Sequence, residues 1–120
     1  MPQDSAVRRG SWAEDLAVVY LEAQGYSVLV RNFRCPEGEI DIVAQEAETL
    51  VFVEVRARNN TEYGHPLETI GPTKIGRIIK AAKNFVHQVG PVTLPIRFDA
   101  LGIILQDEPI FELVKEAFEA

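Results

Sequence analysis

The chain has 120 residues, 47% of them hydrophobic and 25% charged, a composition and length that suit one globular domain over residues 1–120, with residues 1–9 expected to be flexible. A single cysteine, Cys35, excludes an internal disulfide, and the lack of a long apolar run excludes a membrane partner, so a cytoplasmic location is expected. The net charge of −6 counts in bulk against a nucleic-acid partner, but its distribution is more informative.

The predicted elements follow the order α-β-β-β-α-β-β. A first helix is expected over residues 11–24, because Ser11 and Glu14 match a capping box and Gly25 suits the end of a helix. Helical spacing of apolar residues predicts a second helix over residues 72–89. The expected strands cover residues 26–33, 39–45, 50–57, 96–105 and 110–114. This order predicts an α/β domain with helices packed on a sheet.

The segment GEIDIVAQEAETLVFVEVRAR, residues 38–58, resembles two paired strands whose apolar pattern is interrupted by charges. Side chains alternate faces along a strand, so Glu39 and Asp41 share one face of the first strand. Glu54 and Arg56 share one face of the second. If the strands pair, these charges can converge beside the sheet. They form either a solvated sheet face with cross-strand ion pairs or a carboxylate site for a hard divalent cation.

Basic residues gather in the predicted second helix, which contains no acidic residue. They are Lys74, Arg77, Lys80 and Lys83. These four cations could form a solvated helix face, or they could bind the phosphates of a nucleic acid that the carboxylates alone would repel. Farther along the chain, Arg97 and Asp99 share a strand face, and we expect them to pair with each other.

The spacing of Asp41 and Glu54-Val55-Arg56 resembles the core motif of the PD-(D/E)XK nuclease superfamily, in which an aspartate precedes Glu-x-Lys by a dozen or so residues. The helix with Gly10 and Glu14 is similar to that of the archaeal Holliday-junction resolvases. The chain as a whole resembles the bacterial YraN family of predicted endonucleases. The segments that carry this resemblance are GSWAEDLAVVYL at 10–21, RNFR at 31–34, GEIDIVA at 38–44 and VFVEVRAR at 51–58.

This resemblance implies a restriction-endonuclease-like fold, a mixed sheet flanked by helices. It also implies a Mg²⁺- or Mn²⁺-dependent endonuclease that acts on DNA, with branched DNA and a homodimer suggested by the resolvases. Asp41 and Glu54 would hold the metal together with the carbonyl oxygen of Val55. Glu14 would reach the same site from the first helix, although the capping box also explains this residue.

The position of the superfamily lysine is occupied by Arg56. An arginine keeps its charge, so it can stabilise a phosphoryl oxygen but is a poor base. Glu39 would support the metal ligands or hold a second metal, or it is a solvated strand end. A binding module that keeps the fold without turnover stays open as an alternative function, as does a domain that binds a partner other than nucleic acid.

Overall fold

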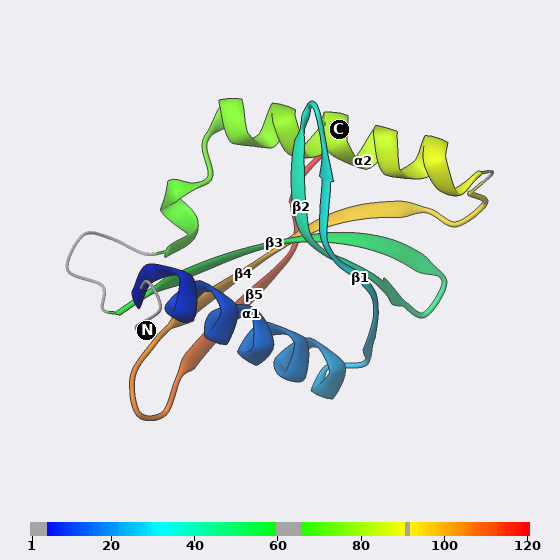
Figure 1. The fold of residues 1–120 in the computed structure, drawn as a ribbon. Coiled ribbons are helices and arrows are strands. Elements are labelled where there is room, and N and C mark those ends of the chain that lie inside the picture. Colours follow the sequence, from blue (N-terminus) through cyan, green and yellow to red (C-terminus); the bar gives the residue numbers. More distant parts are fainter. Residues whose placement is uncertain (1–4, 60–65, 91) are drawn as a thin grey trace.

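The fold is built on a five-stranded sheet with one helix on each face (Figure 1). The structure, a computed structural model, describes residues 5–59, 66–90 and 92–120, without the side chains of residues 5–11 and of Glu68. Its elements are α1 (Ser5–Ala23), β1 (Tyr26–Cys35), β2 (Gly38–Glu46), β3 (Thr49–Arg58), the short 3₁₀ helix η1 (Pro66–Thr69), α2 (Pro72–Val89), β4 (Ile96–Ile104) and β5 (Ile110–Phe118). The predicted fold class and element order are confirmed.

The strands lie in the order β1-β2-β3-β4-β5, and the β3–β4 pair is parallel while the other three pairs are antiparallel. Parallel neighbours need a crossover connection, and the segment that contains α2 provides it. The central strand β3 is covered on both faces, so Val51 and Val53 pack toward α1, and Phe52 packs toward α2. Of the helices that the structure describes, neither is long and apolar enough to cross a membrane.

Two predicted boundaries were wrong by four residues or more. The first helix begins at Ser5, so Ser11 lies inside it and cannot be its N-terminal cap. Gly10 does not stop the helix, because an internal glycine costs only about 1 kcal/mol relative to alanine. The last strand continues to Phe118, because the ring of Phe118 stacks on Phe98 with 5.1 Å between the ring centroids. Residues 1–4 of the expected flexible start lie outside the described chain, and residues 5–9 are helical.

The hairpin of β1 and β2 separates from β3 and lies over α2 (Figure 1). Pairing between β2 and β3 ends at Ile42 and Val53, although β2 itself starts four residues earlier. The tip of the hairpin is attached to α2, since Asn84 donates a hydrogen bond of 3.0 Å to Glu37. Close contact is possible because Gly38 has no side chain: a Cβ there would lie 3.2 Å from both Cβ and the carbonyl oxygen of Arg77. This separation opens a fork between β2 and β3.

Candidate functional site

The fork between β2 and β3 brings Asp41 and Glu54 together, and we call these two residues the carboxylate pair. On the N-terminal side of Ile42, the backbone of β2 no longer pairs with β3. There the side chain of Asp41, instead of the β2 backbone, binds β3. Its Oδ2 atom accepts a hydrogen bond of 2.8 Å from the backbone nitrogen of Val55. Asp41 is therefore held at the edge of β3, next to the residue that carries the second carboxylate.

The second carboxylate, Glu54, is buried under α2. Strand alternation places it on the same face as Phe52, and its side chain is only 1% exposed. Two cations approach its Oε2 atom: Nη2 of Arg56 at 3.0 Å and Nζ of Lys74 at 3.4 Å. Neither is aligned for a hydrogen bond, so within the described chain Oε2 is buried without a hydrogen-bond partner. Such a carboxylate is costly to bury.

The environment of Glu54 favours its protonated form. Burial raises the pKa of Glu54 to about 8, and the hydrogen bond and negative charge of Asp41 contribute to the same shift. The positive charges of Arg56 and Lys74 lower this pKa, but they do not offset burial. A divalent cation that binds the carboxylate pair would therefore compete with a proton for Glu54.

Glu14, the third carboxylate predicted for this site, is bound to residues of β1. Its Oε1 atom accepts hydrogen bonds from Nε of Arg31 at 2.7 Å and from Nδ2 of Asn32 at 2.9 Å. Arg31 pairs with Ile42 in the β1–β2 ladder, and continued pairing would place Asn32 opposite Asp41. Glu14 is thus linked to the strand position beside Asp41. Over residues 5–59, 66–90 and 92–120, no three acidic, histidine or cysteine side chains are grouped to hold a metal.

The remaining predicted site residues lie on the surface. Glu39 forms an ion pair of 3.2 Å with Arg34, and both side chains are largely exposed. Three of the predicted nucleic-acid-binding cations are exposed along α2: Arg77, Lys80 and Lys83. The fourth, Lys74, contacts Glu54 instead. The helix sequence carries a signal for this difference, because Lys74 lies four positions before the buried Ile78 and so on the face of α2 toward the sheet.

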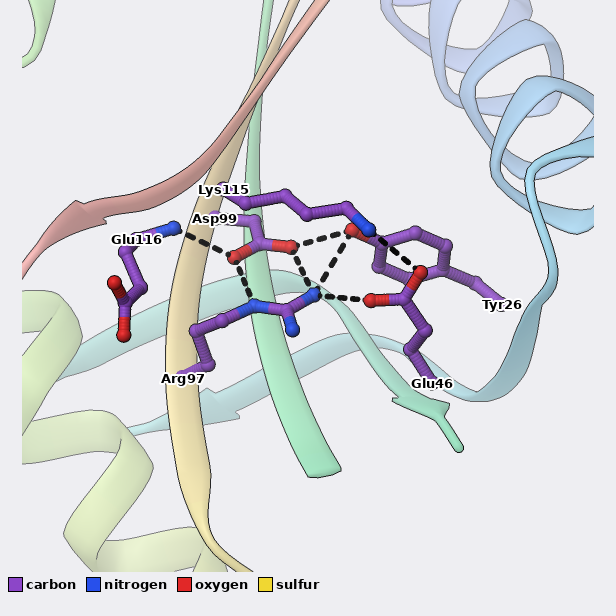
Figure 2. A network of polar contacts seen from close by, with 6 residues as sticks. All are labelled: Tyr26, Glu46, Arg97, Asp99, Lys115 and Glu116. Atoms are coloured by element: carbon purple, nitrogen blue, oxygen red, sulfur yellow. Dashed lines mark hydrogen bonds and ion pairs between the residues drawn. The ribbon is translucent and has the colours of Figure 1, made fainter. Parts of the chain in front are cut away.

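A second polar cluster, the Asp99 network, lies on the face of the sheet that α1 covers (Figure 2). Its side chains are Tyr26, Glu46, Arg97, Asp99 and Lys115. Asp99 is fully buried, and Nε of Arg97 donates to its Oδ1 at 2.8 Å, which confirms the predicted pair. Oδ2 of Asp99 also accepts from the hydroxyl of Tyr26 at 2.6 Å, and the backbone nitrogen of Glu116 donates to Oδ1.

The rest of the Asp99 network was not predicted from the sequence. Arg97 and Lys115 each donate 2.7 Å hydrogen bonds to Glu46, and they lower the pKa of that carboxyl group. Burial and the Asp99 carboxylate raise the pKa of Tyr26, so its hydroxyl remains a donor. The partners come from four strands, and Tyr26 and Asp99 are 73 positions apart. Local sequence patterns carry no signal for such a contact.

The sequence of this chain matches a family of known proteins. Residues 13–103 match the uncharacterised protein family UPF0102. A UPF0102 protein of Syntrophus aciditrophicus (strain SB) is 40% identical over 94% of this chain and 90% of its own length. A UPF0102 protein of Geobacter sulfurreducens is 44% identical over 92% of this chain and 88% of its own length.

Among solved structures, Pyrococcus furiosus SfsA in complex with Ca²⁺ is 14% identical to this chain. The match covers 98% of this chain and 66% of the SfsA chain. Its TM-score of 0.28 is too low to relate the two folds. The sequence matches to UPF0102 proteins, in contrast, extend over most of both chains. This chain belongs to the uncharacterised protein family UPF0102.

Proposed function

We propose that this protein is a metal-dependent endonuclease that hydrolyses phosphodiester bonds of DNA at the carboxylate pair. The observation that carries the proposal is Glu54, a carboxylate 1% exposed that contacts Asp41 and has an Oε2 atom without a hydrogen bond from the described residues. A buried carboxylate beside a second, half-buried one is costly, and a hard divalent cation with oxygen ligands offsets that cost. The likeness of the motif to the PD-(D/E)XK superfamily supports the same activity.

The donor set suits Mg²⁺ or Mn²⁺. Asp41 and Glu54 would supply carboxylate oxygens, and Val55 would supply its carbonyl oxygen. The N–H and C=O groups of one strand residue point to the same side, and the N–H of Val55 points to Asp41, so its carbonyl also faces the fork. A metal bound there supplies Lewis-acid chemistry, because it polarises a phosphoryl oxygen and lowers the pKa of bound water.

The other residues of the site would bind and orient the DNA. Arg56 remains charged and can stabilise negative charge that develops on the phosphoryl oxygens. Lys74 lies beside it and can bind the same or the adjacent phosphate. Arg77, Lys80 and Lys83, exposed along α2, would contact phosphates farther along the strand. Glu14 would position Arg31 and Asn32 next to Asp41.

The resolvase resemblance extends the proposal to branched DNA and a homodimer, since a two-fold enzyme suits a symmetric junction. A cytoplasmic location is part of the same proposal. The substrate assignment depends on analogy between folds, so it is tested by a panel of labelled DNAs rather than by one substrate. The panel contains single-stranded, duplex, flapped and four-way DNA.

The deciding experiment incubates this panel with Mg²⁺ or Mn²⁺ and compares the wild type with Asp41→Ala and Glu54→Ala. Both variants should lose cleavage, because each removes a metal ligand. Glu39→Ala is the matched control, since it removes a carboxylate from the same strand outside the pair. It should cleave like the wild type. The proposal is wrong if Asp41→Ala and Glu54→Ala leave both metal binding and cleavage unchanged.

A nucleic-acid-binding module without turnover is the second candidate. It is favoured by Arg56 and Lys74, which both contact Oε2 of Glu54 without a metal. It predicts that DNA binding persists in a chelator and that no member of the panel is cut. A domain that binds a partner other than nucleic acid predicts no DNA affinity even at low salt, where phosphate contacts are strongest.

A further inference from the structure

The two cations of the site are bound to the same atom that a metal would need. Arg56 and Lys74 both contact Oε2 of Glu54, at 3.0 and 3.4 Å. Their side chains are 29% and 30% exposed, so each has a path into solvent. One buried oxygen cannot accommodate both organic cations and also coordinate a divalent ion at close range. The two occupations of Oε2 therefore compete.

We propose that Glu54 couples DNA binding to metal binding: without a metal it retains Lys74 and Arg56, and when it ligates a divalent cation it releases both side chains to bind phosphate. The inference deepens the proposed function and depends on it, because it takes the fork to bind both a metal and DNA. Lys74 and Arg56 then act as phosphate-binding residues whose availability is set by Glu54.

The charges of the site support this coupling. When both carboxylates are ionised, their two negative charges cancel the positive charges of Arg56 and Lys74, so a phosphodiester meets a neutral site. A divalent cation changes this sum to +2 while it takes over the carboxylates. Long, partly exposed lysine and arginine side chains can reorient at little cost. By linkage, bound DNA must raise the affinity for the metal by the same factor as the metal raises the affinity for DNA.

The test measures DNA affinity rather than cleavage. A fluorescently labelled DNA duplex is titrated by anisotropy in chelator or in Ca²⁺, under otherwise identical conditions. Gels run in parallel check that the DNA stays intact. We expect Ca²⁺ to tighten wild-type binding about tenfold, within the range usual for coupled sites. The slope of log affinity against log salt should steepen by about 1 to 2, because each new phosphate contact adds about 0.9.

Glu54→Gln separates this mechanism from simple charge neutralisation by the metal. The variant removes the charge that retains Arg56 and Lys74, so it should bind DNA in chelator about as tightly as the wild type does in Ca²⁺, and it should no longer respond to Ca²⁺. Thermal unfolding checks that Glu54→Gln is folded. An unchanged affinity of the folded variant in chelator would overturn the inference.

Lys74→Ala and Lys83→Ala form a matched pair on α2, one inside the site and one outside it. Lys74→Ala should weaken DNA binding in Ca²⁺ by several-fold and change the affinity in chelator much less. Lys83→Ala should weaken binding equally in both conditions, because this exposed lysine contacts neither carboxylate of the pair. Equal losses in both conditions for Lys74→Ala would contradict the inference.

The two proposals fail in different ways. If Ca²⁺ and Glu54→Gln change DNA affinity as described but no substrate is cut, the nuclease proposal is wrong and the coupling stands. If cleavage occurs and requires Asp41 but DNA affinity is indifferent to Ca²⁺ and to Glu54→Gln, the nuclease stands and the coupling is wrong. A protein that binds no DNA under either condition would refute both.

Discussion

Two buried carboxylates, Glu54 and Asp99, lie almost side by side in the sheet and have opposite surroundings. In the parallel β3–β4 ladder, Asp99 is paired with Val53, and Glu54 is paired with Ala100. Asp99 lies on the face of the sheet that α1 covers, and each of its carboxylate oxygens accepts a hydrogen bond. Glu54 shares the face of α2, and its Oε2 atom has two cations nearby but no aligned donor among the described residues.

This difference separates a structural network from a site that is incomplete by itself. Buried polar groups are normally hydrogen-bonded, and each exception needs an explanation such as an absent ion or a chemical role. The Asp99 network is closed, so it stabilises the junction of four strands. In the carboxylate pair, Oε2 of Glu54 has no hydrogen-bond partner among the described residues, so we expect the pair to matter more for binding than for folding. Four measurements test this contrast.

The largest loss of stability is expected from Asp99→Asn, which removes the buried negative charge that pairs with Arg97. Breaking a buried ion pair from one side typically costs about 3–5 kcal/mol. Urea unfolding at neutral pH should show this loss for Asp99→Asn and a far smaller change for Glu54→Gln. Equal destabilisation by the two substitutions would show that both carboxylates are structural.

The free energy of unfolding should fall as the pH rises, and the direction of this change identifies Glu54. Its pKa is raised to about 8 from the ordinary value of 4.5, so the folded state binds the proton more tightly than the unfolded state. The stabilisation is complete below about pH 4.5 and is lost as the pH rises through about 8, by on the order of a few kcal/mol. Glu54→Gln should remove this decline, as measured by urea unfolding at several pH values. A decline that persists in the variant would assign it to another group.

Gly38→Ala should disturb the fork without affecting the Asp99 network. The added Cβ would lie 3.2 Å from the backbone oxygen and Cβ of Arg77, so the hairpin must shift on α2. Overpacking of this kind costs about 1–3 kcal/mol. We expect weaker Ca²⁺ binding by calorimetry, because Asp41 moves with the hairpin. Unchanged Ca²⁺ affinity would show that the position of the hairpin does not control the carboxylate pair.

The smallest effect is expected from Lys115→Ala, at the solvent-exposed end of the Asp99 network. The ion pair of Lys115 with Glu46 is half exposed, and such pairs contribute under about 1 kcal/mol. The variant should unfold at nearly the same urea concentration as the wild type and bind DNA equally well. Together with Lys74→Ala it compares one lysine of each cluster, and a clear effect on DNA binding would place Lys115 in the binding surface.

Local patterns predicted the parts of this fold that depend on neighbouring residues. Strand alternation predicted that Asp41 and Glu54 would meet, although not the fork that holds them, and i, i+2 spacing predicted the pair of Arg97 and Asp99. The contact of Lys74 with Glu54 was not predicted, because the docking of α2 over the sheet decides it. Likewise, the extension of β5 to Phe118 depends on packing against Phe98, which no local propensity encodes.

The parallel pairing of β3 with β4 also has a consequence for the order in which the site assembles during folding. The β2–β3 hairpin joins neighbouring segments, and hairpins form in about 1–10 μs. Lys74 belongs to the crossover between β3 and β4, and pairing between strands distant in sequence is slow because a long loop must close first. We therefore expect the two carboxylates to meet before Lys74 arrives. During that interval a divalent ion has no competitor from α2, so metal in the folding medium should accelerate folding of the hairpin region.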